Sequence, residues 1–99
     1  MAIVEVSVMP LGTGTPSISR YVANAVQVLK GEKGVKYDLT AMGTIMEGDL
    51  DRLLDLVRRM HQSAFDAGAT RVVTTVKIDE RRDKPATIAS KVASVRKQL

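Results

Sequence analysis

Apolar and polar residues alternate along several stretches of the chain, which is the pattern of strands with one buried face. Residues 3–9 and 71–79 alternate in this way and are rich in valine, isoleucine and threonine. Residues 35–42 alternate as well, and Gly43 separates them from a short stretch of the same kind at residues 44–47. We therefore expect two long strands with a β-hairpin between them in the sequence.

Three other stretches repeat apolar residues every three or four positions, which predicts amphipathic helices. The first helix is expected to begin near Thr15 or Ser17, because either hydroxyl can act as its N-cap. The second is expected to begin after Asp49 and to end at Gly68, and the third to cover residues 86–99. The apolar stripes of the three helices are Ile18, Val22, Ala25, Val26 and Leu29; Leu50, Leu53, Leu54, Val57, Met60, Ala64 and Phe65; and Ile88, Val92, Val95 and Leu99.

The order of these elements is β-α-β-β-α-β with one more helix, which is the split βαβ pattern. Two right-handed crossovers place the first two helices on one face of a four-stranded antiparallel sheet. We therefore expect residues 1–99 to form a single α+β domain with a ferredoxin-like fold and an extra C-terminal helix.

The opposite face of this sheet is left open by the first two helices. If the valines of the first strand face the helices, the open face carries Ile3, Glu5, Ser7 and Met9. The last strand adds either the alternate residues or Val73, Thr75, Lys77 and Asp79. A large exposed patch with isoleucine and methionine is unusual in a soluble monomer, so a second subunit or the last helix is expected to cover it.

Composition excludes several classes of protein. The 99 residues include no cysteine, which excludes disulfides and thiolate metal sites. No apolar run approaches the ~20 residues that span a bilayer. Residues 1–9 contain Glu5 and no basic region, unlike a signal peptide. We therefore expect a cytoplasmic protein that does not enter a membrane.

The net charge is the one feature that points toward nucleic acid. The 15 lysines and arginines exceed the 11 aspartates and glutamates, giving a formal charge of +4, and a basic balance attracts polyanions. However, only three aromatic residues, Tyr21, Tyr37 and Phe65, are available to stack on single-stranded bases. Nucleic acid is therefore not an expected partner.

The loop after the first predicted strand joins a strand end to a helix start, where backbone N–H groups can hold an anion. Its candidate anion-binding residues are Gly12, Thr13, Gly14 and Ser17. The loop lacks the Gly-Lys-Ser/Thr ending of a phosphate-binding P-loop. A turn followed by an N-cap is the simpler interpretation, and we favour it.

The predicted hairpin brings hydroxyls beside a sulfur and a carboxylate, in Tyr37, Thr40, Met42, Thr44 and Glu47. A carboxylate beside a pyrimidine nitrogen makes a charge-assisted hydrogen bond. This group of side chains could therefore hold a polar heterocycle. An ordinary amphipathic hairpin explains the same residues equally well.

Catalytic and metal-binding residues are sparse. His61 is the only histidine, and one histidine makes neither a triad nor a typical metal site, so we expect a half-buried helix residue. Glu5 and Glu47 fall on neighbouring strands, but nothing else supports acid–base catalysis. The basic segment at residues 81–84 is interpreted as a solvated turn or a subunit contact. We expect no cofactor and no metal.

Three ordered blocks of sequence carry a resemblance to a known family. They are EVSVMPLGTG at residues 5–14 with Ser17, Tyr21 and Val22 following; YDLTAMGT at residues 37–44 running into Glu47, Gly48 and Asp49; and RVVTTVKID at residues 71–79 followed by Arg81, Arg82, Asp83 and Lys84. With these blocks the chain resembles, over nearly its whole length, the small thiamine-binding-protein family of the YkoF-like superfamily. Ala41 stands where relatives often have proline, which bears on the shape of the hairpin and not on the fold.

The resemblance implies a ferredoxin-like fold assembled into dimers and tetramers through sheet faces and edges, without catalytic activity. It also implies binding of thiamine or its hydroxymethylpyrimidine moiety near subunit contacts. Carried over by position, the ligand-lining candidates are Glu5, Ser7, Thr40, Met42, Thr44 and Glu47. Because thiamine is a cation, the two glutamates are expected to supply the negative charge.

Three functions remain open from the sequence. The leading hypothesis is a non-enzymatic protein that binds thiamine or a pyrimidine precursor. One alternative is a structural or regulatory homo-oligomer whose open face serves assembly alone, and another is an enzyme that acts on pyrimidine compounds. A polar cavity that remains after the sheets pack would favour a bound ligand over assembly alone.

Overall fold

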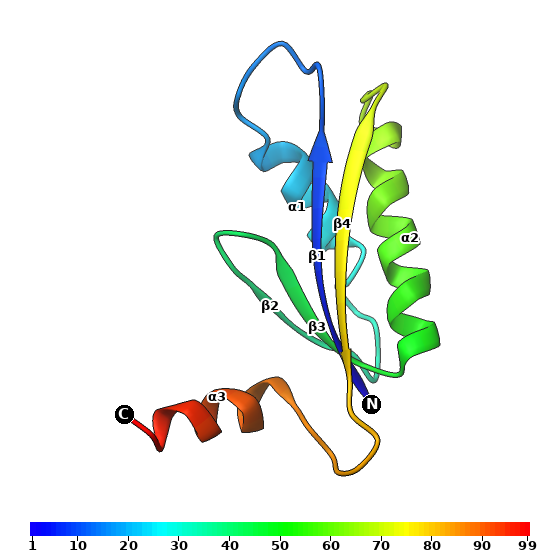
Figure 1. Ribbon diagram of the computed structural model, residues 1–99. Helices are drawn as coiled ribbons and strands as arrows, with labels where there is room; N and C mark the ends of the chain where they lie inside the picture. The colour runs from blue at the N-terminus through cyan, green and yellow to red at the C-terminus, as the bar shows by residue number, and fades with distance from the viewer.

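Seven elements follow one another along the chain in the predicted order, and the computed structural model describes all 99 residues. They are β1 (Ala2–Pro10), α1 (Ser19–Gln27), β2 (Lys36–Leu39), β3 (Thr44–Gly48), α2 (Leu50–Asp66), β4 (Val72–Glu80) and α3 (Ile88–Arg96). The strands form one antiparallel sheet in the order β2-β3-β1-β4, and α1 and α2 pack on one face of it (Figure 1). This is the expected ferredoxin-like α+β arrangement, with α3 as an additional helix.

Alternate side chains of β1 point to the two faces of the sheet, one covered by helices and the other open. Val4 of β1 lies opposite Met46 of β3 and Ile78 of β4. Directly paired residues share a face, and Val4 and Met46 are completely buried. The open face carries the odd-numbered residues of β1, namely Ile3, Glu5, Ser7 and Met9, as predicted. Their pairing decides which residues of β4 join them: Val73, Thr75, Lys77 and Asp79.

The long helix α2 supplies much of the core. Its buried residues are Leu53, Leu56, Val57, Met60 and Ala64. The predicted stripe was partly wrong, because Leu54 and Phe65 are 39% and 37% exposed and Leu56 takes a place in the core instead. Each exposed residue is one position beyond a buried one, and that step of about 100° turns it away from the sheet.

Both ends of α2 confirm the prediction. Asp49 is the N-cap, and its carboxylate accepts a hydrogen bond from the backbone N–H of Arg52 at 3.4 Å. Gly68 follows the last turn with a φ of +105°, a conformation in which a side chain would be strained. The N–H of Ala69 then returns to the carbonyl of Ala64, so the helix cannot continue.

The helix α1 begins later than predicted. Its first residue is Ser19, its N-cap position is Ile18, and no side chain caps it. The hydroxyl of Thr13 donates to the carbonyl of Thr15 at 2.9 Å, and the hydroxyl of Thr15 accepts from the N–H of Ser17 at 3.3 Å. Such local bonds compete with helix formation. The expected start at Thr15 or Ser17 was therefore wrong.

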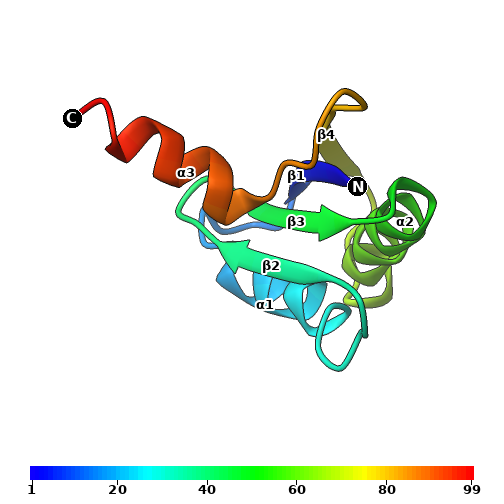
Figure 2. The same cartoon turned by 90° about the horizontal axis from the view of Figure 1, so that it is seen from below.

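The C-terminal helix α3 lies on the other side of β2 from α1 (Figure 2). It begins with a capping box, in which Thr87 and Ser90 accept hydrogen bonds from each other's backbone N–H. None of its residues is buried, and Val92 and Val95 are 46% and 62% exposed. A single chain thus leaves the predicted apolar stripe of this helix largely uncovered.

The hairpin turn between β2 and β3 packs closely on β1, and a substitution at Gly43 tests this contact. A Cβ on Gly43 would lie 2.8 Å from the backbone oxygen of Val6, closer than real contacts allow. We expect Gly43→Ala to lower the free energy of unfolding by about 1–3 kcal/mol, because the turn must move away from β1. Urea unfolding measures the change. Ala41→Ser, in the same exposed turn, is the control and should stay within about 0.5 kcal/mol; an equally small effect of Gly43→Ala would contradict the close approach.

Candidate functional site

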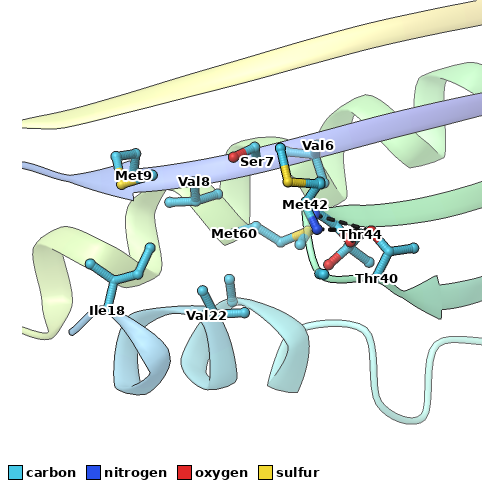
Figure 3. Close-up of a pocket in the computed structure, with 13 residues that line it drawn as sticks. Val6, Ser7, Val8, Met9, Ile18, Val22, Thr40, Met42, Thr44 and Met60 are labelled. Carbon is cyan, nitrogen blue, oxygen red and sulfur yellow. Dashed lines mark hydrogen bonds between the residues drawn. The ribbon is translucent and has the colours of Figure 1, made fainter. Parts of the chain in front are cut away.

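A pocket lies where the pairing of β1 with β3 stops. The two strands pair only as far as Val6 and Thr44, whereas β1 continues to Pro10. The space beside the end of β1 is bordered by α1 and by the hairpin turn at residues 40–43 (Figure 3). We call this space the notch, and its volume is about 230 Å³. Hydroxyl and sulfur groups reach it from Ser7, Met9, Thr40, Met42, Thr44 and Met60.

Thr40 shapes the notch by holding the hairpin turn. Its hydroxyl donates to the carbonyl of Gly43 at 2.8 Å and accepts from the N–H groups of Met42 and Gly43, each at 3.2 Å. One donor and two acceptor positions are all that a threonine hydroxyl has. The hydroxyl of Thr40 therefore has no hydrogen bond left for a ligand. Thr40 presents its methyl group to the notch and holds the backbone of Met42 in place.

Ser7 and Thr44 bring free hydroxyls to the notch from opposite faces of the sheet, because Thr44 pairs with Val6 and Ser7 is the next residue of β1. Neither side chain makes a hydrogen bond within the chain, although Thr44 is only 3% exposed. Every fully enclosed side-chain oxygen in the structure has a hydrogen-bond partner, so the hydroxyl of Thr44 must keep contact with the notch. These two groups can each donate and accept a hydrogen bond to a bound molecule.

The other walls of the notch are apolar and partly soft. Ile18 and Val22 face it from the α1 side, and Met60 faces it from α2 (Figure 3). Met42, at the rim, is 83% exposed and Met9 is 39% exposed, so both can move onto a ligand. The volume is below the ~300–1,000 Å³ of pockets for drug-sized molecules. The notch therefore suits one ring with polar groups at its edge, and it contains no carboxylate.

Glu5 lies outside the notch, on the open face. Its direct cross-strand partners are Ile45 of β3 and Lys77 of β4. It borders a hollow of about 180 Å³ together with Ile3 and Asp79. Since Glu5 is exposed and faces Lys77, water and a nearby ammonium both moderate its charge.

Glu47 lies in a third place, beneath α3. Ile88, Ala89 and Val92 of α3 and the hairpin residues Val35, Lys36, Tyr37, Asp38 and Glu47 border a groove of about 610 Å³. We call this space the α3 groove. Of the six predicted ligand-lining residues, the structure thus brings Ser7, Thr40, Met42 and Thr44 together and separates Glu5 and Glu47 from them.

Some residues of these sites were not predicted. Met9, Ile18, Val22 and Met60 border the notch, but their spacing in the sequence indicated only a strand face or the apolar stripe of a helix. The α3 residues of the groove were likewise interpreted as a stripe in need of a partner. The signal that could have found the notch is the length of β1, which exceeds the short strand at residues 44–47.

One ion pair holds α3 to the sheet. The ammonium of Lys91 donates a hydrogen bond to Oδ2 of Asp79 on β4 at 2.6 Å. That hydrogen bond and the charge of Lys91 lower the pKa of Asp79 below its ordinary value, and Arg81 and Lys77 act in the same direction. Ionised Asp79 therefore favours the docked position of α3, by the modest amount that an exposed ion pair contributes.

The remaining candidates have structural partners. Nδ1 of His61 lies 2.6 Å from the hydroxyl oxygen of Thr74, and its ring meets Phe65 edge-on at 5.3 Å. In the basic turn, the guanidinium of Arg81 binds Asp83 and lowers the pKa of that carboxyl. The predicted anion-binding residues Gly12, Thr13, Gly14 and Ser17 lie in a loop ahead of α1 rather than at its first turn.

The structure contains no cluster of three or more histidine, cysteine, aspartate or glutamate side chains that could hold a metal ion. Its helices are too short or too polar for any of them to cross a membrane.

Comparison with known proteins identifies the family. The family described as "Thiamine-binding protein" matches residues 4–96 of this chain. The chain belongs to the thiamine-binding protein family. It is 45% identical over 102 aligned residues to the UPF0045 protein YqgV of Bacillus subtilis, and the match covers 100% of this chain and 98% of that protein.

Two solved structures agree with this membership. A hypothetical protein of Methanocaldococcus jannaschii superimposes with a TM-score of 0.88 at 40% identity, over 96% of this chain and 95% of that one. A domain of unknown function, DUF77, from Bacillus cereus superimposes with a TM-score of 0.82 at 38% identity, over 98% and 91% of the two chains. Both structures thus share the arrangement seen here, and this member of the thiamine-binding protein family has the ferredoxin-like fold that the resemblance implied.

The Asp79–Lys91 pair gives a pH-dependent prediction. Because Lys91 lowers the pKa of Asp79 in the folded chain, the pair is fully formed above the ordinary aspartate pKa of about 3.9. It is lost as the pH falls through the lowered value. We therefore expect α3 to become mobile on acidification, and Asp79→Asn to make it mobile at pH 7. The ¹⁵N heteronuclear NOE of residues 88–96 measures this mobility.

Asp83→Asn is the matched control for this experiment, because it removes the same charge from a pair that lies within the turn. It should leave the NOE values of α3 near those of the original chain. Equal NOE values for the Asp79→Asn variant and the original chain at pH 7 would contradict the role of the pair.

Proposed function

We propose that this protein binds thiamine or its hydroxymethylpyrimidine moiety and does not convert it. The observation that carries the proposal is the pair of unpartnered hydroxyls, Ser7 and Thr44, in a notch sized for one ring, in a chain of the thiamine-binding protein family. An aminopyrimidine ring presents donors and acceptors at its edge, which these hydroxyls can match. Met9 and Met42 offer polarisable contacts to the ring face.

The positive charge of thiamine needs a carboxylate that the notch does not contain. Glu5 and Glu47 are the candidates on the open face. Both lie on strands that border the notch, and the charge of either would favour a cation over an anion.

The side chains around these sites support binding without turnover. No nucleophile beside a general base lines the notch, the hollow at Glu5 or the α3 groove. Acid–base catalysis needs such groups within hydrogen-bond reach of the reacting atoms. We therefore favour a protein that stores, delivers or senses its ligand over an enzyme that acts on pyrimidine compounds.

We also propose that the chain assembles into a dimer or tetramer, with the ligand near subunit contacts. β4 pairs with β1 on one side only, so the other edge of this nine-residue strand presents free N–H and C=O groups. Val73, Val76 and Ile78 on this strand are 45%, 37% and 47% exposed. A long apolar edge of this kind favours pairing with a second chain. The same observation favours the second candidate function, assembly without a small ligand.

Isothermal titration with thiamine and with hydroxymethylpyrimidine tests the ligand. We expect saturable binding of at least one of them, and Thr44→Val should weaken it about tenfold, since an unpartnered polar group in a buried contact costs roughly 1–3 kcal/mol. Thr75→Val on β4, a residue outside the notch, should leave the affinity unchanged. No heat with either compound from the folded protein would contradict the proposal and favour assembly alone.

Light scattering tests the assembly. We expect a mass of two or four times the 10.7 kDa chain, and the double variant Val76→Lys with Ile78→Lys should shift it to the single-chain mass by adding charge along the edge of β4. Ala23→Lys changes an exposed residue on α1, away from the edge of β4, and should keep the assembly. A single-chain mass for the original protein would overturn the proposed oligomer.

A further inference from the structure

Glu47 is a buried residue whose carboxylate has no partner within the chain. Glu47 is 6% exposed, and none of the hydrogen bonds or ion pairs in the chain involves its side chain. Since every fully enclosed side-chain oxygen has a hydrogen-bond partner, the small exposed area of Glu47 must include its carboxylate oxygens. They open onto the α3 groove, which Glu47 borders from β3.

The α3 groove combines this carboxylate with apolar walls. α3 crosses the side of the hairpin opposite α1 (Figure 2) and contributes Ile88 and Val92, and Val35 adds a third apolar side chain. Asp38 is a second acid in the groove, and Lys36 is its one base. The ammonium of Lys91 on α3 forms an ion pair with Asp79 and does not neutralise the acids of the groove. The groove therefore carries a net negative charge behind an apolar wall.

Lys36 does not neutralise Glu47. It lies directly opposite Glu47 in the strand register, yet no ion pair within 4.0 Å joins the two, and Lys36 is exposed. A carboxylate withdrawn from water is unfavourable until it gains a counter-ion. A cation that enters the groove would satisfy Glu47 and compete only with a solvated lysine.

Glu5 is the weaker candidate for the same role. It is exposed, whereas Glu47 is buried, so water already screens its charge. Its hollow, at about 180 Å³, is also smaller than the α3 groove at about 610 Å³. Of these two spaces, only the α3 groove falls in the ~300–1,000 Å³ range of small-molecule sites.

We propose that the α3 groove binds an organic cation, with Glu47 as its counter-ion and the C-terminal helix α3 as its outer wall. This deepens the proposed function, because it assigns the positive charge of the ligand to one of two carboxylates and gives α3 a role. The notch and the α3 groove share no lining residue, so the two sites can be tested separately.

The first test uses a cation that is not thiamine. Benzyltrimethylammonium chloride is titrated into the full-length protein while the methyl signals of Ile88, Val92 and Val35 are followed by NMR. We expect saturable shifts at these methyl groups, and no shifts with benzyl alcohol, which has the ring without the charge. Glu47→Gln should weaken binding at least tenfold, and Lys36→Gln should tighten it about threefold by removing a competing cation.

Glu80→Gln is the matched control, since it removes one glutamate carboxylate from the end of β4, outside the groove, and it should change the affinity less than twofold. Val92→Lys, an exposed change on α3, should also weaken binding by placing a positive charge in the wall. Unaltered affinity in Glu47→Gln, or shifts confined to residues outside the groove, would overturn the proposal.

Titration with thiamine then separates this proposal from the proposed function. Thiamine binding that Glu47→Gln weakens supports both. Thiamine binding that is insensitive to Glu47→Gln overturns the cation site alone. Binding of benzyltrimethylammonium without binding of thiamine supports the cation site and contradicts thiamine as the ligand.

Discussion

The arrangement of the molecule depends on one strand that is hydrogen-bonded along both edges. β1 pairs with β3 on one side and β4 on the other, and its side chains alternate between a buried and an open face. A slip of one residue would exchange the faces, placing Glu5 and Ser7 in the core and Val4 and Val6 in solvent. The hydrophobic core therefore fixes the register, and the register fixes where every polar group of the open face stands.

The same constraint explains why most of the fold could be predicted from the sequence. Strand alternation has a period of two, and the even-numbered residues of β1 are all apolar, so the buried face is unambiguous. The ends of α2 were predictable because Asp49 and Gly68 act on their nearest neighbours in the chain. The start of α1 was not, because Thr13 and Thr15 bond within the loop and the N-cap position falls on Ile18, whose side chain cannot cap a helix.

Only those residues of the candidate site that are close together in the sequence could be predicted to meet. Thr40, Met42 and Thr44 meet because they belong to one hairpin, and Ser7 joins them because it is the first residue of β1 beyond the last β1–β3 pair, Val6 with Thr44. The different surroundings of Glu5 and Glu47 could not be predicted, since they depend on where α3 crosses the sheet. That path follows the polar segment between β4 and α3 and one ion pair, neither of which leaves a periodic signal.

The small size of α3 has a consequence for how this part of the chain behaves in time. A nine-residue helix is shorter than the ~12–15 residues at which isolated helices become even marginally stable in water. Its capping box supports the first turn only, so the rest of the helix persists only while the segment is docked. Docking and coil-to-helix folding of residues 88–96 are therefore one equilibrium. Undocking removes the wall of the groove by unwinding it, and circular dichroism would register that event as lost helicity rather than as a rigid-body swing.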